Sequence, residues 1–294
     1  MTDIEAKLIR EQPRFKGIGK LKRKIGEASF AEIKDEEALD FAGAVLSAAD
    51  KEKRVFCSDF ISEDMIKLIL SNGCEPVFID IAEEDWNLDP EVLKPAFEKY
   101  PDVKTVITHE TPDECSFYDV CGEHEIRLIE EKTVLFSGAQ PDREADIYDC
   151  YAERLEKSGL MYMDPLGISC LICDCGAGYE TDETQHGTSS PDEIKEVLEA
   201  FGAKSRRLSI PLHMRTEYST YDHITLDGSV RDWKYGADSI WERSDESRFI
   251  YEHGLLLPND NSITAEEQDH IIEIIYSSFD APDFSRDLWI AAKA

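Results

Sequence analysis

Short apolar runs alternate with segments of helical periodicity through the first half of the chain. Each run lacks charged residues at its centre, as expected of a strand that is buried on both faces. The predicted strands cover residues 55–57, 76–81, 103–107 and 133–136. Strands that alternate with helices in this way indicate βαβ units around a mostly parallel sheet.

The helices predicted between these strands have recognisable ends. Ser62 is suited to cap a helix that Gly73 stops, and its apolar residues recur on one face. Asp89 is suited to cap a second helix, with Pro90 at the first helical position. A third helix is predicted over residues 120–130, with Ile126 and Ile129 turned inward.

The second half of the chain has a different pattern of predicted strands and helices. An apolar strand is predicted at 167–175, and two capping boxes follow, Ser190-Pro-Asp-Glu and Thr264-Ala-Glu-Glu, each opening an amphipathic helix. Strands and helices separated by a long loop fit a small α+β domain. We therefore expect a large α/β domain over residues 1–164 and a small C-terminal domain over 165–294.

Charge narrows the classes of function. The 294 residues include 63 Asp and Glu against 32 Lys and Arg, for a net charge of −31. This charge repels phosphate backbones, so nucleic-acid binding is not expected. The first ten residues do not resemble a signal peptide, and no apolar run is long enough to span a membrane. We therefore expect a cytoplasmic protein with reduced cysteines.

The residues that could bind a metal have no recognised spacing. Cys170, Cys173 and Cys175 are close together, but their segment alternates like a strand, and no second pair of ligands follows at zinc-finger spacing. Buried thiols are the favoured interpretation, and no metal site is expected. His109 and His213 could each face a cleft, although a single histidine is more often structural.

Three segments, taken together, resemble one family. Residues 73–93 (GCEPVFIDIAEEDWNLDPEVL), 191–215 (PDEIKEVLEAFGAKSRRLSIPLHMR) and 250–275 (IYEHGLLLPNDNSITAEEQDHIIEII) are similar, in the same order, to motifs of the DegT/DnrJ/StrS family. These proteins are nucleotide-sugar aminotransferases that use pyridoxal phosphate (PLP). The resemblance implies the PLP-transferase fold of type I and a dimer whose active sites lie between subunits.

The resemblance also implies positions for the cofactor. In the family a hydroxyl-rich loop binds the phosphate, and the matching stretch here contains Glu36 among three acids, which would repel a phosphate. The aromatic residue that stacks on the cofactor ring matches Ser62, which has no ring. The acid that keeps the ring nitrogen protonated matches Ser137, and a glutamine near the phenolic oxygen matches Gln140.

The Schiff-base lysine has no direct match. The nearest candidate is Lys157, one residue away from one of the two possible alignments. The family's "PlH" turn matches His213, which we expect on the substrate side. The resemblance also implies that a family segment of long helices is deleted after Asp164.

These losses favour a catalytically degenerate protein of aminotransferase fold that acts as a binding or partner subunit. No cofactor is expected, and a heterodimer with an active homologue is slightly favoured over a homodimer because two copies would combine their negative charge. One alternative is an active PLP transaminase of a nucleotide-linked keto-sugar that uses Lys157. Another is a protein that binds a sugar or nucleotide without a partner.

Overall fold

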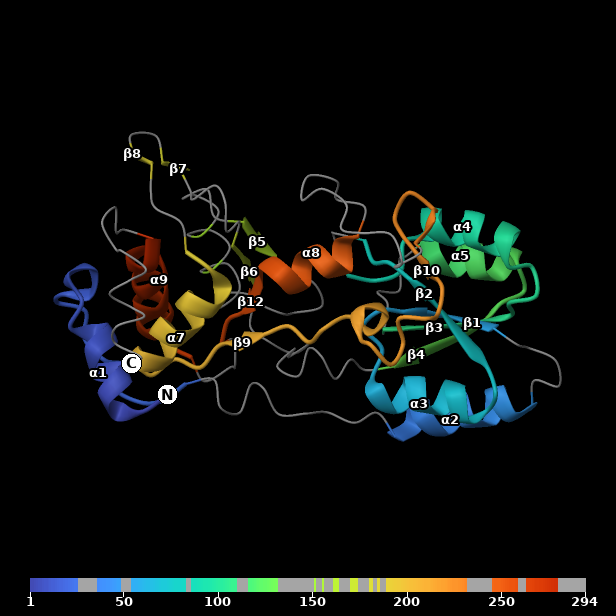
Figure 1. Ribbon diagram of the computed structural model, residues 1–294, viewed down its shortest axis with the longest axis horizontal. Helices are drawn as coiled ribbons and strands as arrows, with labels where there is room; N and C mark the ends of the chain where they lie inside the picture. Colours follow the sequence, from blue (N-terminus) through green and yellow to red (C-terminus); the bar gives the residue numbers. More distant parts are fainter. Residues whose placement is uncertain are drawn as a thin grey trace. The chain divides into compact units, whose positions relative to one another are not determined.

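The chain forms two compact units, each made of segments that are far apart in the sequence (Figure 1). The parallel-sheet unit comprises residues 32–137 and 209–252, and the antiparallel-sheet unit comprises residues 1–31, 138–208 and 253–294. The computed structural model describes residues 1–25, 36–48, 54–82, 86–109, 116–131, 151, 155, 161–163, 170–173, 180–181, 184–185, 189–231, 245–258 and 263–279.

The two units differ from the contiguous domains 1–164 and 165–294 expected from the sequence. Strand β10 (His223–Ile224) pairs in parallel with β2 (Glu75–Ile79), which brings residues 209–252 into the first sheet. At the other end of the chain, Ala6 and Ile9 join the core of the antiparallel-sheet unit. A strand of two residues leaves no periodic pattern, so the sequence did not indicate that residues 209–252 return to the first sheet.

The parallel-sheet unit has a six-stranded sheet in the described residues. The order is β11-β10-β2-β1-β3-β4, and every neighbouring pair is parallel except the β10–β11 hairpin. Its strands are β1 (Arg54–Ser58), β2 (Glu75–Ile79), β3 (Thr105–His109), β4 (Arg127–Glu131), β10 (His223–Ile224) and β11 (Val230–Arg231). The predicted parallel α/β sheet is therefore confirmed.

Helices cover both faces of this sheet (Figure 1). The period-two geometry of β1 turns Val55 and Cys57 toward one hydrophobic cluster and Phe56 toward the other. The first cluster contains residues of α2 and α3, and the second contains residues of α4 and α5. These helices are α2 (Glu36–Ala48), α3 (Glu63–Ser71), α4 (Pro90–Lys99) and α5 (Ser116–Glu123), and the unit also holds η4 (Leu212–Met214) and α8 (Glu246–His253).

Two predicted helix starts are confirmed. The Ser62 hydroxyl accepts a hydrogen bond from the Met65 N–H at the start of α3, and Asp89 accepts one from the Glu91 N–H at the start of α4. Replacing such a cap by alanine typically costs about 1 kcal/mol. The caps therefore fix where each helix begins after its strand.

The helix predicted over residues 120–130 is confirmed only as far as Glu123 and is wrong beyond it. Helix α5 ends at Glu123, Glu125 has a positive φ of 55°, and β4 runs from Arg127 to Glu131 beside β3. The spacing of Ile126 and Ile129 fits a helix as well as a strand, and pairing with β3 decides between them. The strand predicted at 133–136 lies outside the described residues.

The antiparallel-sheet unit has a four-stranded sheet in the described residues, in the order β5-β6-β12-β9. Its strands are β5 (Met161–Met163), β6 (Cys170–Ile172), β12 (Gly254–Leu256) and β9 (Arg206–Arg207), and a separate hairpin joins β7 (Glu180–Thr181) to β8 (Thr184–Gln185). The apolar strand predicted at 167–175 thus corresponds to β6. Cys170 and Cys173 are buried free thiols, as expected, whereas Cys175 lies outside the described residues.

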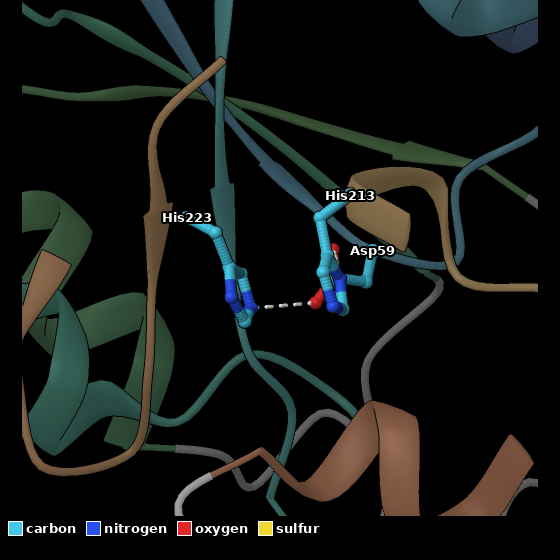
Figure 2. Close-up of side chains that lie close together, drawn as sticks. All are labelled: Asp59, His213 and His223. Atoms are coloured by element: carbon cyan, nitrogen blue, oxygen red, sulfur yellow. Dashed lines mark hydrogen bonds and ion pairs between the residues drawn. The ribbon is translucent and has the colours of Figure 1, made fainter. Parts of the chain in front are cut away.

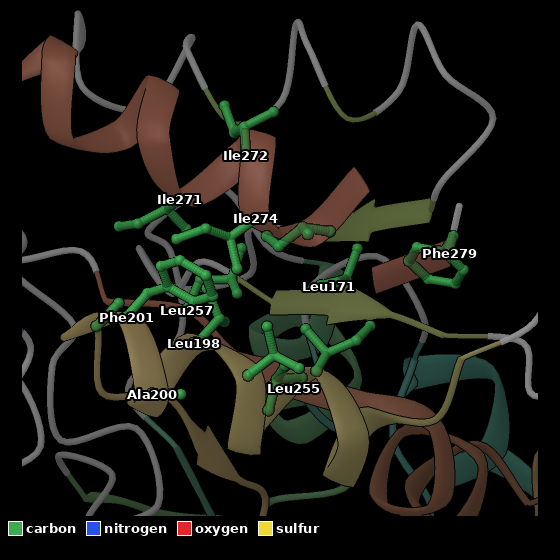
Figure 3. Close-up of a cluster of buried hydrophobic side chains, with 14 of the residues drawn as sticks. Leu171, Leu198, Ala200, Phe201, Leu255, Leu257, Ile271, Ile272, Ile274 and Phe279 are labelled. Carbon is green, nitrogen blue, oxygen red and sulfur yellow. The ribbon is translucent and has the colours of Figure 1, made fainter. Parts of the chain in front are cut away.

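Helices α1 (Asp3–Arg10), η1 (Pro13–Phe15), α7 (Pro191–Phe201) and α9 (Ala265–Phe279) complete this unit. Both predicted capping boxes are confirmed, at Ser190 with Glu193 and at Thr264 with Glu267. Leucines of the sheet pack with apolar residues of α7 and α9 in one core (Figure 3). The most buried members include Leu171, Leu198, Phe201, Leu255, Ile271, Ile272 and Ile274.

Among the described residues, no helix is both long and apolar enough to cross a lipid bilayer.

Candidate functional site

A buried polar residue lies at the carboxyl end of each of the four long strands. Asp59 follows β1, Asp80 follows β2, and His109 and Glu131 end β3 and β4. All four are at most 1% exposed. Strand β1 lies between β2 and β3, so the chain builds the sheet first on one side of β1 and then on the other. In open α/β sheets, ligands bind at the carboxyl edge beside such a switch point. This edge is therefore the candidate functional site.

Asp59 holds two histidines that come from a distant part of the chain. Its Oδ1 is 2.6 Å from Nδ1 of His213 in η4, and its Oδ2 is 3.1 Å from Nε2 of His223 in β10. The backbone N–H of Leu212 also donates to the Asp59 carbonyl, which anchors the turn that carries His213. Figure 2 shows the two imidazole rings lying face to face, with centroids 3.9 Å apart and planes 2° apart.

The start of α8 adds two more carboxylates to this group. The N–H groups of Glu246 and Ser247 donate to the Asp80 carboxylate at 2.8 and 3.0 Å. Asp245 accepts from the Arg248 N–H and so caps the helix, and its Oδ2 lies 3.4 Å from Nε2 of His213. We call Asp59, Asp80, His213, His223 and Asp245 the carboxyl-edge cluster.

Electrostatics differ among members of the cluster. Burial opposes the charged form of His213, but the attraction of Asp59 and hydrogen bonds to Asp245 and Asp59 outweigh it and raise the pKa of His213 to about 10. Burial likewise opposes the charge on Asp59, yet both histidines hold its pKa well below the usual 3.8. Burial raises the pKa of Asp80 to about 6, with Asp245 and Asp59 adding to the effect and His223 opposing it.

A second pair of contacts lies at the ends of β3 and β4. Nε2 of His109 is 3.3 Å from the Ser58 hydroxyl, and burial lowers the pKa of His109 to about 3, so this imidazole is neutral. The Glu131 carboxylate accepts hydrogen bonds from the backbone N–H and the hydroxyl of Ser62. Ser62 thus binds an acid at the position where the family resemblance implies an aromatic ring.

The structure describes three of the six residues predicted for the site. Glu36 opens α2 and is exposed, Ser62 caps α3, and His213 is fully buried in the carboxyl-edge cluster. The expected contact of His213 with a substrate stays a prediction. Ser137, Gln140 and Lys157 lie outside the described residues.

The position of β4 changes the candidate for the ring acid. The match to Ser137 assumed that the fourth strand runs over residues 133–136, whereas the fourth strand of the sheet ends at Glu131. The acid at the carboxyl end of that strand is therefore Glu131. One acid alone does not make the described residues fit PLP. Ser62 offers no aromatic ring to stack on the cofactor. Glu36 and Glu37 lie at the start of α2, where the resemblance places the cofactor's phosphate, and their carboxylates would repel it.

Sequence reasoning missed most of the cluster. Asp59 and Asp80 each follow an apolar strand directly, and this pattern is the signal that was available for them. Asp245 precedes an amphipathic segment as a helix cap would. No signal marked His223, which lies on a strand of two residues.

Two sets of residues in the cluster could hold a metal ion. The first set is Asp59, His213 and His223, and the second is Asp80, His223 and Asp245. In each set one nitrogen or oxygen from every residue lies within 4.8 Å of the others. The sets share His223, and all five residues are buried.

Comparisons with known proteins show which proteins share this fold. No family model and no curated protein matches the sequence. Among solved structures, a DegT/DnrJ/EryC1/StrS aminotransferase from Brucella abortus is similar over 87% of this chain and 84% of its own, with a TM-score of 0.56 and 14% identity.

Two other solved structures are similar over most of both chains. PseC of Helicobacter pylori, an aminotransferase of pseudoaminic acid biosynthesis, matches over 95% of this chain and 97% of its own, with a TM-score of 0.54 and 12% identity. DesV of S. venezuelae, solved in complex with a ketimine intermediate, matches over 95% and 94%, with a TM-score of 0.58 and 10% identity. The chain therefore has the fold of the DegT/DnrJ/EryC1/StrS sugar aminotransferases.

Proposed function

We propose that this chain is a non-catalytic protein of aminotransferase fold that acts as a partner subunit and does not hold PLP as an internal aldimine. The observation that carries this proposal is the contact between Ser62 and Glu131. In the family, the residue at the position of Ser62 stacks on the cofactor ring, and the acid at the position of Glu131 pairs with the ring nitrogen. Here they are bonded to each other, and Ser62 also serves as the cap of α3.

Surface features of the described residues support association. Phe41 on α2 is 57% exposed, and Ile4 on α1 is 74% exposed with Leu8 one turn further along the same helix. Large exposed apolar side chains are a common feature of interfaces. Two copies of this chain would bring a charge of −31 each into contact, so a less acidic homologue is the favoured partner.

One observation favours a second candidate function, the binding of a nucleotide-like anion by the chain alone. The antiparallel-sheet unit has a pocket of about 400 Å³ with six basic side chains and two acidic ones in its lining. The side chains of Lys20, Lys24 and Lys204 form no ion pair within the described residues. The basic residues are Arg10, Lys20, Lys22, Arg23, Lys24 and Lys204, and the acids are Asp3 and Glu199.

One set of measurements on the purified chain separates the two functions. If the chain is a partner subunit, sedimentation velocity at micromolar concentration should show a complex with a catalytically intact homologue from the same organism, and Phe41→Glu should weaken it. If it binds a nucleotide, uridine diphosphate should bind the isolated chain, and affinity should fall at least tenfold in Lys20→Glu/Lys24→Glu.

Lys16→Glu is the matched control for the binding measurement, because Lys16 is exposed in the same basic segment but does not line the pocket. A chain that stays monomeric with and without the homologue would contradict the role of partner subunit. A similar loss of affinity in the control variant would show a general effect of charge and remove the case for the pocket.

A further inference from the structure

Within the carboxyl-edge cluster itself, three buried carboxylates face two imidazoles. Asp59, Asp80 and Asp245 are 0%, 0% and 5% exposed, and the two histidines are at most 1% exposed. Even if both imidazoles were protonated, two positive charges would face three carboxylates. Buried charges in proteins are paired or coordinate metals, because burying an uncompensated charge is very costly.

His223 is the second sign of a missing ligand. It is fully buried, and within the described residues neither of its ring nitrogens makes a hydrogen bond of acceptable geometry. Its Nε2 is 3.1 Å from Asp59, a distance that fits an ion pair, while Nδ1 has no hydrogen-bond partner in the described part of the chain. Buried polar groups without a hydrogen bond are rare in folded proteins, and a bound water or ion is one of the explanations for them.

Ring geometry decides between the two possible ligand sets. A nitrogen of neutral imidazole binds a metal through a lone pair that lies in the plane of the ring. The rings of His213 and His223 are stacked with their planes only 2° apart, so both cannot direct lone pairs at one ion between them. The set of Asp80, His223 and Asp245 uses one histidine and leaves the 2.6 Å contact of His213 with Asp59 intact.

We propose that Asp80, His223 and Asp245 bind a divalent transition-metal ion. One imidazole and two carboxylates are ligands that suit Zn²⁺ or Mn²⁺ better than soft thiolate-seeking ions. With His213 matched to Asp59, the two carboxylates of the set would be balanced by the two charges of the ion. His213 would then hold Asp245 from outside at 3.4 Å, in the manner of supporting groups around metal centres.

The site would have a structural role. Asp80 follows β2, His223 lies on the neighbouring β10, and Asp245 caps α8, so an ion would join three segments that are up to 165 residues apart. No side chain of the set is more than 5% exposed, so the ion would be enclosed and would stabilise the folded state only.

Zinc is the probe for the test. The full-length protein is stripped with EDTA, incubated with Zn²⁺, desalted, and measured for metal content and thermal midpoint. We expect one zinc ion per chain and a midpoint about 5 °C or more above that of the stripped protein. Both effects should be lost in His223→Gln and in Asp245→Asn, the second of which can still cap α8 because asparagine is also a good cap.

His124→Gln is the matched control, since His124 follows α5 at the opposite edge of the sheet. Binding of Co²⁺ checks the ligands, because a thiolate such as that of Cys57 would add a strong near-ultraviolet charge-transfer band that nitrogen and oxygen ligands lack. Failure of the folded protein to retain zinc would overturn the proposal, as would full retention by either cluster variant. A thiolate band from cobalt would also overturn it.

Discussion

Asp59→Ala is expected to lower the free energy of unfolding by about 3–5 kcal/mol, the usual cost of removing one partner from a buried ion pair. Asp59 is fully buried and contacts His213, His223 and the Ser247 hydroxyl. Its removal would leave two imidazoles and a hydroxyl facing an apolar methyl group. Urea denaturation followed by circular dichroism measures the change directly.

Asp40→Ala is the control for this variant, because Asp40 is exposed on α2 and its removal should change stability by no more than about 0.5 kcal/mol. The double variant Asp59→Ala/His213→Ala should lose less than the sum of the two single losses, since it removes both members of the pair. A loss below about 1 kcal/mol in Asp59→Ala would mean that the pair contributes little.

The stability of EDTA-treated protein is expected to fall by a few kcal/mol as the pH rises from about 6.5 to about 10. The pKa of His213 is raised from 6.5 to about 10 in the folded state, so the folded chain holds this proton more tightly than the unfolded chain does. The stability that comes from this proton is fully present below pH 6.5 and is lost as the pH rises through 10.

The charged groups that face His213 are Asp59 and Asp245, and His223 stacks on its ring. Thermal melts between pH 6 and 10 test the expected decline, with His213→Gln as the comparison. The variant should be less stable at pH 6 but should show a shallower decline with rising pH. Parallel declines in the two proteins would assign the pH dependence to the general negative charge of the chain instead.

Local signals predicted the frame of the fold well. The caps at Ser62, Asp89 and Ser190 depend on a side chain and the next few backbone N–H groups, so a short stretch of sequence contains all the information. The parallel sheet followed from the alternation of strands and helices. Residues 127–131 could not be assigned in this way, because the pairing with β3 that makes them a strand involves residues about twenty positions away.

The candidate site depends on contacts across much longer separations. Asp59 and Asp80 could have been proposed from the sequence, because each directly follows an apolar strand of a parallel sheet. His213 was singled out through its "PLH" turn as a residue on the substrate side, which stays a prediction. Its bond to Asp59, 154 positions earlier, could not be read from that turn. His223 could not be proposed, because only the tertiary fold places its short strand beside β2.

The most direct test of the proposed loss of the cofactor is a visible absorption spectrum after incubation with PLP and removal of the unbound cofactor. We predict no band near 400 nm and, after treatment with borohydride, no PLP attached to the protein by mass spectrometry. Lys157→Ala is the comparison, since Lys157 is the lysine nearest the matching position in the sequence. A borohydride-reducible band that disappears in this variant would contradict the proposal and indicate an active transaminase.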